Sequence, residues 1–322
     1  MIVAFLDLLG FSQLIEQSEI SAFEVLNIFN FAIKTKVTDE KTHPIEEYER
    51  LYPDDKEIAR FAEKNSLSSV KYLISISDSL VLASNDESNL FIEQLSCLLA
   101  ALYINYSKPF KSAFIDIRQV YCDSFNQGVK RMAFPIVFRG GLSEGDNCAF
   151  FKEIMMNNGK FSFNGYNVFG GTYLKAVKLE KVGKGPRLFC DKSIIDSVQN
   201  CSLFRLVDKE KEVYEIVWTI MGCESTGCSV SEPWNNVVDR IRDKMLPATI
   251  NLYKYYKNNR IKDENVWLHY KELLTLVCRG IVKYAKDKCN KAENALGLIN
   301  QKLKANDIEI FRLDELMEGF IE

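Results

Sequence analysis

The chain opens on an apolar run that a single charge interrupts. Residues 2–9 are apolar apart from Asp7, as expected for a β-strand that is covered on both faces. Gly10 can form the following turn and Ser12 can cap a helix, and apolar residues then recur at helical spacing as far as Phe31. The pattern predicts a strand, a tight turn and a helix, with Asp7 near the end of the strand.

A second aspartate lies between two further apolar runs. Residues 72–76 and 80–83 flank the polar triplet Ser77-Asp78-Ser79, which suits the tip of a β-hairpin. If this hairpin and the first strand are neighbours in one sheet, the chain brings two carboxylates together at the same edge.

Strands and helices alternate through the rest of the first 220 residues. The pattern predicts strands at 136–142, 150–155, 166–169 and 187–190, helices at 89–106 and 172–182, and a hairpin over 204–218 that turns at 208–211. Two polar segments indicate insertions, an exposed one over about 38–70 with a helix near 56–64, and a looser one over about 108–132. This order of elements indicates an α+β fold.

After residue 220 the pattern becomes purely helical. Residues 222–229 have the composition of a linker, and apolar side chains beyond them recur at helical spacing, among them Trp234, Val238 and Ile241. We therefore predict two units, one over residues 1–220 and a C-terminal all-helical region over 230–322.

Composition and charge narrow the classes of function. The 322 residues are 47% hydrophobic and 26% charged, which is typical of a soluble globular protein. The 41 basic and 44 acidic residues give a net charge of −3 without a long basic run, so we expect no nucleic-acid partner. No apolar stretch is long enough to span a membrane, and Met1 leads directly into the first strand, so we expect no membrane contact and a cytoplasmic location.

Cysteines and histidines do not suggest a metal site of their own. The nine cysteines are irregularly spaced, and the two histidines, His43 and His269, lie far apart, so we expect reduced thiols rather than a zinc site. One stretch is locally basic, with only Glu180 opposing Lys175, Lys178, Lys181, Lys184 and Arg187. It indicates either a solvated helix face or a surface that attracts a triphosphate.

The two aspartates carry the candidate chemistry. Mg²⁺ and Mn²⁺ prefer oxygen ligands and keep positions open for substrate phosphates, which suits Asp7, Asp78 and the backbone carbonyl of Leu8. Backbone amides at the turn can hold phosphate at the start of the helix, and they belong to Leu9, Gly10, Phe11 and Ser12. Taken alone, either aspartate is also typical of a strand end or a turn.

Four short motifs, in this order, resemble the catalytic domain of class III nucleotide cyclases. They are FLDLLGFS (5–12), SISDSLVL (75–82), FRGGLSEGD (138–146) and GYNVFGGTYLKAVKLE (165–180). The resemblance implies a ferredoxin-like α+β sandwich over residues 1–220, a nucleoside-triphosphate substrate, and two Mn²⁺ or Mg²⁺ ions per site held by Asp7 and Asp78.

The chain departs from this family at the residues that contact the base and the transition state. Ile74 and Asn167 stand where adenylate cyclases have the Lys and Asp that read adenine, and Leu174 replaces the Asn that positions the ribose. Lys178 stands where the family has its transition-state arginine. A lysine keeps the charge but lacks the planar fork of a guanidinium, so the role can survive with altered geometry, while a solvated helix residue is the alternative.

These departures, the insertions, the helical tail and the residues Gly170, Ala176 and Glu180 look most like the bacterial pyrimidine nucleotide cyclases of Pycsar anti-phage systems. That resemblance implies conversion of UTP to cyclic UMP, with cytidylate or adenylate cyclase activity as alternatives. Asn167 carries both a donor and an acceptor and cannot by itself distinguish uracil from cytosine. A catalytically silent nucleotide-binding scaffold is the alternative of another class.

The resemblance also implies a homodimer with composite sites. One subunit would supply the metal ligands Asp7 and Asp78, and the other would supply Asn167 for the base and Lys178 for catalysis. The remaining assignments are Phe5 and Ile74 beside the base, and Lys209 or Lys211 reaching the phosphates from the late hairpin.

Overall fold

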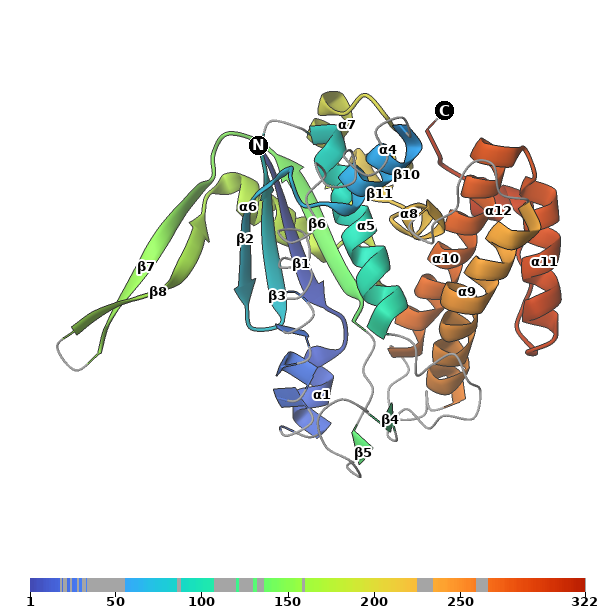
Figure 1. The fold of residues 1–322 in the computed structure, drawn as a ribbon, viewed down its shortest axis with the longest axis horizontal. Helices are drawn as coiled ribbons and strands as arrows, with labels where there is room; N and C mark the ends of the chain where they lie inside the picture. The colour runs from blue at the N-terminus through green and yellow to red at the C-terminus, as the bar shows by residue number, and fades with distance from the viewer. Residues whose placement is uncertain are drawn as a thin grey trace.

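A central mixed sheet organises the first two thirds of the chain. The structure, a computed structural model, describes residues 1–17, 19, 22–23, 25–27, 29–30, 33, 56–85, 88–106, 120–121, 130–131, 136–157, 160–224, 234–258 and 266–321. Seven strands form the sheet in the order β10-β11-β9-β6-β1-β3-β2 (Figure 1). Their bounds are β1 Ile2–Leu8, β2 Val70–Ile76, β3 Ser79–Ser84, β6 Phe138–Glu144, β9 Leu188–Asp191, β10 Phe204–Asp208 and β11 Val213–Ile216.

Strand pairing confirms the α+β class. All neighbouring pairs are antiparallel except β6 and β9, which run parallel. The first strand, β1, is central, with β3 on one side and β6 on the other. Its sequence is apolar on both faces because both faces of a central strand are covered.

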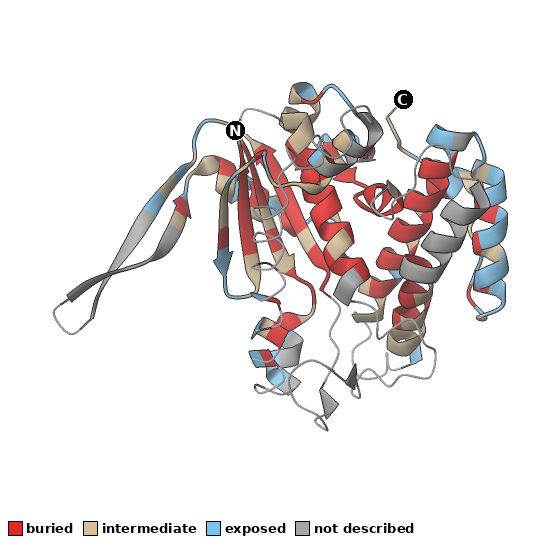
Figure 2. Ribbon diagram, in the orientation of Figure 1, coloured by how far each residue is buried: buried red, intermediate tan, exposed pale blue. Residues whose placement is uncertain are grey.

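The two faces of β1 meet different partners. Successive side chains of a strand point to opposite faces, so Ile2, Ala4, Leu6 and Leu8 enter the main core, which includes α5 (Ser88–Tyr106). β3 and most of α5 are buried there as well (Figure 2). The opposite face carries Val3, Phe5 and Asp7, and part of it is covered by α6 (Gly171–Glu180). Asp7 therefore lies on the α6 face of the sheet.

Helix α6 lies unusually close to β6, and a glycine permits the approach. A Cβ atom at Gly141 would lie 2.1 Å from the carbonyl oxygen of Ala176 and 2.7 Å from Cβ of Leu179. Both contacts involve the helix near its backbone, which cannot move aside as a flexible side chain can.

We expect Gly141→Ala to destabilise the protein by about 1–3 kcal/mol, because overpacking displaces α6 from the sheet. Chemical denaturation measures this change. Gly297→Ala is the matched control, since a Cβ there meets nothing within 4 Å and alanine favours a helix. Equal stability of the Gly141 variant and the parent protein would contradict this account of the close packing.

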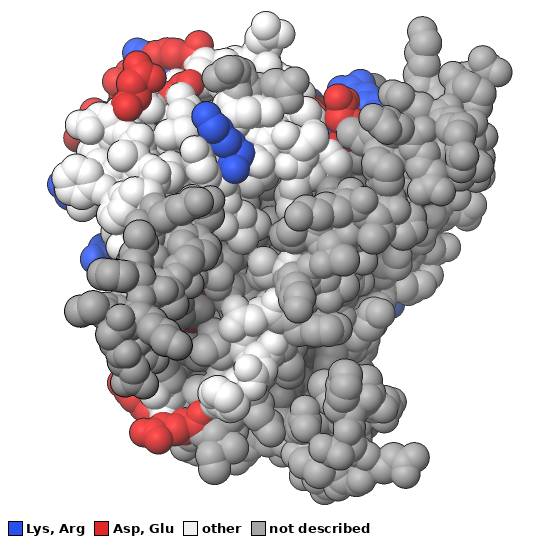
Figure 3. Space-filling model, turned by 60° about the vertical axis from the view of Figure 1, so that its left-hand side comes forward, with Lys and Arg blue, Asp and Glu red and all other residues white. Residues whose placement is uncertain are grey.

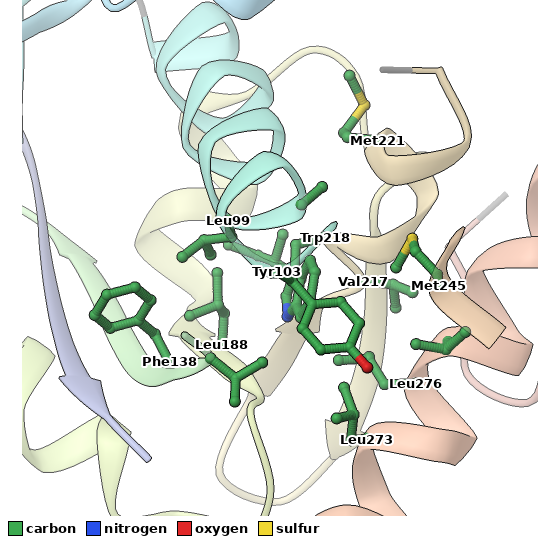
Figure 4. Packing of buried hydrophobic residues seen from close by; sticks show 14 of the residues in the cluster. Leu99, Tyr103, Phe138, Leu188, Val217, Trp218, Met221, Met245, Leu273 and Leu276 are labelled. Carbon is green, nitrogen blue, oxygen red and sulfur yellow. The ribbon is translucent and has the colours of Figure 1, made fainter. Parts of the chain in front are cut away.

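The C-terminal helices share the core of the sheet. They are α8 (Thr219–Glu224), α9 (Trp234–Asn258), α10 (Val266–Cys289), α11 (Ala292–Lys304) and α12 (Leu313–Met317). Trp218 and Tyr103 pack edge to face at the junction, beside leucines of α10 (Figure 4). The hydroxyl of Thr219 donates a hydrogen bond to the carbonyl of Leu276, 2.7 Å away.

Part of the expected linker belongs to this shared core. Residues 222–224 lie in α8, where Gly222 and Cys223 are buried, while residues 225–233 lie outside the described residues. The expectation of a linker from residue 222 is wrong for these three residues. The all-helical character of the tail is confirmed for its described helices, and the division into two units stays a prediction.

A two-stranded hairpin projects from the body of the molecule. It consists of β7 (Ala149–Asn157) and β8 (Lys160–Phe169) and extends away from the sheet (Figure 1). Its base packs on the sheet, where the rings of Phe150 and Tyr72 stack at 4.4 Å. A smaller ribbon pairs β4 (Val120–Tyr121) with β5 (Lys130–Arg131).

Three further short helices are α1 (Phe11–Gln17), α4 (Lys56–Asn65) and α7 (Lys192–Ser197), and the residues described between 19 and 33 are also helical. The pattern missed α7. It predicted α4, but the expectation of a fully exposed insertion is wrong there, because Lys64 is buried and lies 3.6 Å from Glu93 of α5. The rest of both insertions, residues 38–55 and most of 108–132, lies outside the described residues.

The described residues also bear on the expectations for membrane spans, cysteines and surface charge. No described helix has the length and hydropathy needed to cross a bilayer. The cysteines whose side chains are described form no disulfide, and no three His, Cys, Asp or Glu residues gather as metal ligands in the described ranges. On the face shown in Figure 3, the described Lys and Arg side chains lie in small separate groups.

Candidate functional site

The structure brings Asp7 and Asp78 together at one end of the sheet. Asp7 on β1 lies opposite Ser79 on β3, so Asp78 in the β2–β3 turn is adjacent to it. The backbone carbonyl of Asp78 accepts a hydrogen bond of 3.0 Å from the amide of Leu8, which ties the turn to β1. Ser77 adopts φ 56°, the left-handed conformation that a two-residue hairpin turn requires.

The two carboxylates affect one another. Burial raises the pKa of Asp78 above its ordinary value, and the negative charge of Asp7 raises it further. Hydrogen bonds from its own backbone amide and from Ser77, together with the charge of Arg139, act in the opposite direction without cancelling the shift. An added positive charge beside the pair would therefore be favourable.

Arg139, on the neighbouring strand β6, supplies one such charge. Its Nε and Nη2 atoms lie 3.1 and 3.0 Å from Oδ2 of Asp7, while the hydroxyl of Ser79 donates to Oδ1 at 3.1 Å. On its other side, Nε of Arg139 lies 2.5 Å from Oε1 of Glu180. The guanidinium thus lies between two carboxylates.

Glu180 is the buried member of this group. It lies at the end of α6 with a side chain only 4% exposed, and burial raises its pKa, with a smaller contribution from Asp7. The sequence analysis noted Arg139 and Glu180 as parts of motifs but gave neither a role at the site. Arg139 lies two residues before Gly141, the glycine that contacts α6. This spacing points to the site only after β6 has been placed beside β1.

The carboxylate pair fits a divalent cation. Its donors are hard oxygen atoms, and their mutual repulsion is the electrostatic condition that a bound Mg²⁺ or Mn²⁺ relieves. The ligands would be Asp7, Asp78 and the carbonyl of Leu8. Arg139 competes for Oδ2 of Asp7, so binding of an ion at that oxygen requires the guanidinium to turn toward Glu180.

We expect Asp78→Asn to raise the melting temperature of the protein in a chelating buffer at neutral pH, because it removes the repulsion from Asp7. The gain is below about 1 kcal/mol, since the pair is partly exposed to water. Mn²⁺ should stabilise the parent protein and have little effect on this variant. Thermal denaturation with and without Mn²⁺ checks both statements, and equal stabilisation of the two proteins would count against the metal site.

The turn after β1 has one amide fewer for phosphate than we expected. The amide of Leu9 donates to the carbonyl of Val137 at 2.9 Å, so Leu9 is not available as a phosphate donor. Gly10 takes φ 83°, a conformation that favours glycine, and Phe11 is buried at the start of α1. The candidate phosphate donors are thus the amides of Gly10, Phe11 and Ser12.

The face of α6 that carries Lys178 points away from the sheet. Thr172, Ala176 and Glu180 are buried, whereas Lys178 is exposed. Within one chain, therefore, Glu180 and not Lys178 lies toward the aspartates.

Asn167 lies on the outward face of the β7–β8 hairpin. It is directly opposite Phe151 in the antiparallel register, and Phe169 lies two residues further along the same strand, so the three share one face. Both phenylalanines are exposed, Phe169 by 71%. The other face, with Phe150 and Val168, packs toward the sheet. The Oδ1 atom of Asn167 accepts a hydrogen bond from the amide of Val168.

The two apolar residues assigned to the base differ in accessibility. Ile74 is buried in a cluster with Val3 and Val81, while Phe5 is half-buried and meets the ring of Tyr173 edge to face at 6.1 Å. Phe5 is thus accessible to a ligand, whereas the side chain of Ile74 is enclosed by its own cluster.

Lys209 and Lys211 are not brought to the aspartates. They lie in the β10–β11 turn, and the register places that turn beside Asp191 and hence at the end of the sheet opposite Asp7. Lys211 lies 3.4 Å from Asp208 instead. The expectation that either lysine reaches the phosphates beside Asp7 of its own chain is wrong, because the strand order separates them.

Comparison with known proteins finds similarity only among solved structures. No family model matches the chain, and no curated protein matches it. The chain is similar to the guanylate cyclase domain of RhGC from Catenaria anguillulae in complex with GTP, with 12% identity over 67% of this chain and 94% of that chain and a TM-score of 0.35. It is also similar to the dimeric guanylyl cyclase domain of the RhoGC fusion protein from Blastocladiella emersonii. The identity is 13% over 67% of this chain and 94% of that chain, and the TM-score is 0.34. A third similar structure is the adenylyl cyclase CyaB from P. aeruginosa. The identity is 13% over 67% of this chain and 92% of that chain, and the TM-score is 0.32.

Proposed function

We propose that this protein is a metal-dependent nucleoside-triphosphate cyclase, which forms a 3′,5′-cyclic nucleotide and pyrophosphate. The observation that carries the proposal is the pair of carboxylates, Asp7 on β1 and Asp78 in the adjacent β2–β3 turn, close in sequence to the turn at Gly10. The raised pKa of Asp78 supports it, because burial, and to a smaller extent the charge of Asp7, disfavour the ionised carboxylate, and a divalent ion would offset both effects.

In the proposed reaction the ribose 3′-hydroxyl attacks the α-phosphorus in line and pyrophosphate leaves. Two Mn²⁺ or Mg²⁺ ions, when bound, lower the pKa of the attacking hydroxyl and neutralise charge on the phosphates. The amides of Gly10, Phe11 and Ser12 bind phosphate oxygens, and Lys178 stabilises the charge that develops on the transferred group. Because no covalent enzyme intermediate is needed, positioning supplies much of the acceleration.

A homodimer with composite sites is part of the proposal. Lys178 and Asn167 both face away from the aspartates of their own chain, which suits residues that serve a partner's site. Three large apolar side chains are exposed on the same elements, namely Phe151, Phe169 and Leu174, and Ile76 is exposed at the end of β2. A second copy of the chain would cover them.

Complementation tests the composite site. We expect Asp7→Ala and Lys178→Ala proteins to be inactive separately and to regain up to about a quarter of the parent activity when mixed in equal amounts, because a heterodimer of a two-fold symmetric enzyme has one intact site. Activity is measured as pyrophosphate release after heterodimers have been confirmed by mass. Verified heterodimers without activity would contradict the proposal that the site is shared.

For the base we favour a pyrimidine, with UTP preferred, and a role as a cytoplasmic second-messenger enzyme in anti-phage defence. In this proposal the side chain of Asn167 offers uracil a donor and an acceptor. The ring of Phe5, which packs against Tyr173, limits the space left for the base. Competition among equal amounts of UTP, CTP, ATP and GTP, read by mass spectrometry of the cyclic products, tests the preference. Cyclic UMP as the major product is expected, and cyclic AMP alone would overturn the pyrimidine preference while leaving the cyclase.

A catalytically silent nucleotide-binding protein is the second candidate, and Arg139 favours it. Its guanidinium donates two hydrogen bonds to Oδ2 of Asp7, which is an oxygen that a metal ion would otherwise use. This candidate predicts triphosphate binding without release of pyrophosphate, so a pyrophosphate assay separates the two.

A further inference from the structure

A second charged cluster lies where the sheet meets α10. It combines three arginines, Arg187 before β9, Arg205 on β10 and Arg279 on α10, with Glu215 of β11. Glu215 is fully buried and accepts bonds of 2.5 and 3.1 Å from Nε and Nη2 of Arg187. Arg205 lies directly opposite it in the sheet, with Nη1 3.3 Å from its Oε2.

The cluster holds more positive than negative charge. Among the residues that the structure describes, Glu272 is the one other carboxylate that approaches closely, with Oε2 3.6 Å from Nη1 of Arg187, and its side chain is 34% exposed. Glu318 acts on Arg205 from the exposed surface, where water screens it. Burial, and repulsion from Arg205, lower the pKa of Arg279 to about 10, so the guanidinium is still charged at neutral pH.

Several N–H groups of this cluster lack an acceptor. In the described part of the chain, Nε of Arg205 and Nε of Arg279 are buried without a hydrogen-bond partner, and Nη1 of Arg205 has its 3.3 Å ion-pair contact with Glu215 but no hydrogen bond of good geometry. An unsatisfied buried donor is costly, and more so when it is charged. Water could accept such bonds but would leave the excess charge in place. An anion would satisfy the donors and balance the charge together.

We propose that Arg187, Arg205 and Arg279 form a binding site for a small tetrahedral oxyanion of the phosphate class. The size follows from burial, since Arg187 and Arg205 have side chains only 13% and 10% exposed. A single free oxyanion would displace these buried side chains less than the phosphate of a nucleotide would.

The place of the site in the fold gives it a connection to the aspartates. The backbone carbonyl of Arg187 accepts a hydrogen bond of 2.9 Å from the amide of Gly140, the residue after Arg139. The bound oxyanion thus stabilises the junction of β9, β10 and α10 next to the strand that carries Arg139.

Thermal denaturation with inorganic phosphate tests the proposal in the full chain. At constant ionic strength, with chloride as the reference anion, saturating phosphate should raise the melting temperature by about 2 °C or more. Arg279→Gln should abolish this shift while leaving the phosphate-free protein at least as stable as the parent, because it removes excess positive charge. Arg312→Gln is the control, since Arg312 is 70% exposed and pairs with Asp314, and it should retain the full shift.

The outcomes separate the possibilities. No difference between phosphate and chloride, or an equal phosphate shift in Arg279→Gln and the parent, would overturn the site. A nucleoside monophosphate serves as the second probe. A shift with inorganic phosphate alone supports a free oxyanion, whereas an Arg279-dependent shift with both probes supports the site and extends it to phosphate esters.

Discussion

Glu215→Gln is expected to lower the free energy of unfolding by about 3–5 kcal/mol, because it removes one partner from a buried ion pair. Glu215 is fully buried, accepts two hydrogen bonds from Arg187 and faces Arg205 across the sheet. Glutamine has nearly the same shape but no charge, and its amide nitrogen would meet guanidinium donors. Arg187 would keep the partly exposed Glu272, while Arg205 and Arg279 would lose the nearest carboxylate among the described residues.

Urea denaturation of the purified variants measures this loss. Glu210→Gln is the matched control, because it is the same substitution at an exposed position in the β10–β11 turn. Its free energy of unfolding should stay within about 0.5 kcal/mol of that of the parent. A Glu215 variant as stable as the Glu210 variant would show that the cluster is not held together by this carboxylate.

Asp7→Asn is expected to reduce kcat/KM for cyclic nucleotide formation by at least about 10²–10³-fold, the range typical for removal of one electrostatic contact in an active site. The fold should be retained, since asparagine has nearly the same shape and can keep the bond to Ser79 or the bonds to Arg139, while the partly exposed guanidinium can bond water instead. It loses the charge that holds a divalent ion.

Steady-state kinetics at several Mn²⁺ concentrations provide the test. Asp146→Asn is the control, because Asp146 is exposed between β6 and β7 and should leave the rate unchanged. If Asp7→Asn and Asp146→Asn behave alike, Asp7 has no part in metal-dependent catalysis.

Local pattern was sufficient to place the aspartates. The apolar runs around Asp7 and Asp78 predict strands, and the polar triplet predicts the turn, so their proximity required only that the two strands pair. Arg139 was a different case. Its contact with Asp7 depends on β6 pairing with the other edge of β1, across 132 positions of sequence, which no local periodicity reveals.

The wrong predictions also depend on strand order and burial, which the local sequence pattern does not reveal. Lys209 and Lys211 were assigned to phosphate because they are basic and lie in a turn, but strand direction places that turn at the far end of the sheet. Periodicity also predicts the apolar faces of the C-terminal helices but not what they pack against. Trp218 and Thr219 join those helices to the core of the sheet. Both residues lie just before residue 220, where composition suggested that the first unit ends.

The most direct test of the central claim is mass spectrometry of the products that the purified full chain forms from nucleoside triphosphates and Mn²⁺. The account predicts a 3′,5′-cyclic nucleotide, lighter than the corresponding monophosphate by one water, together with an equal amount of pyrophosphate. It also predicts that neither product forms with the Asp7→Asn/Asp78→Asn protein. Failure of the parent protein to form a cyclic product from any of the four triphosphates, or an equal yield from the double variant, would contradict it.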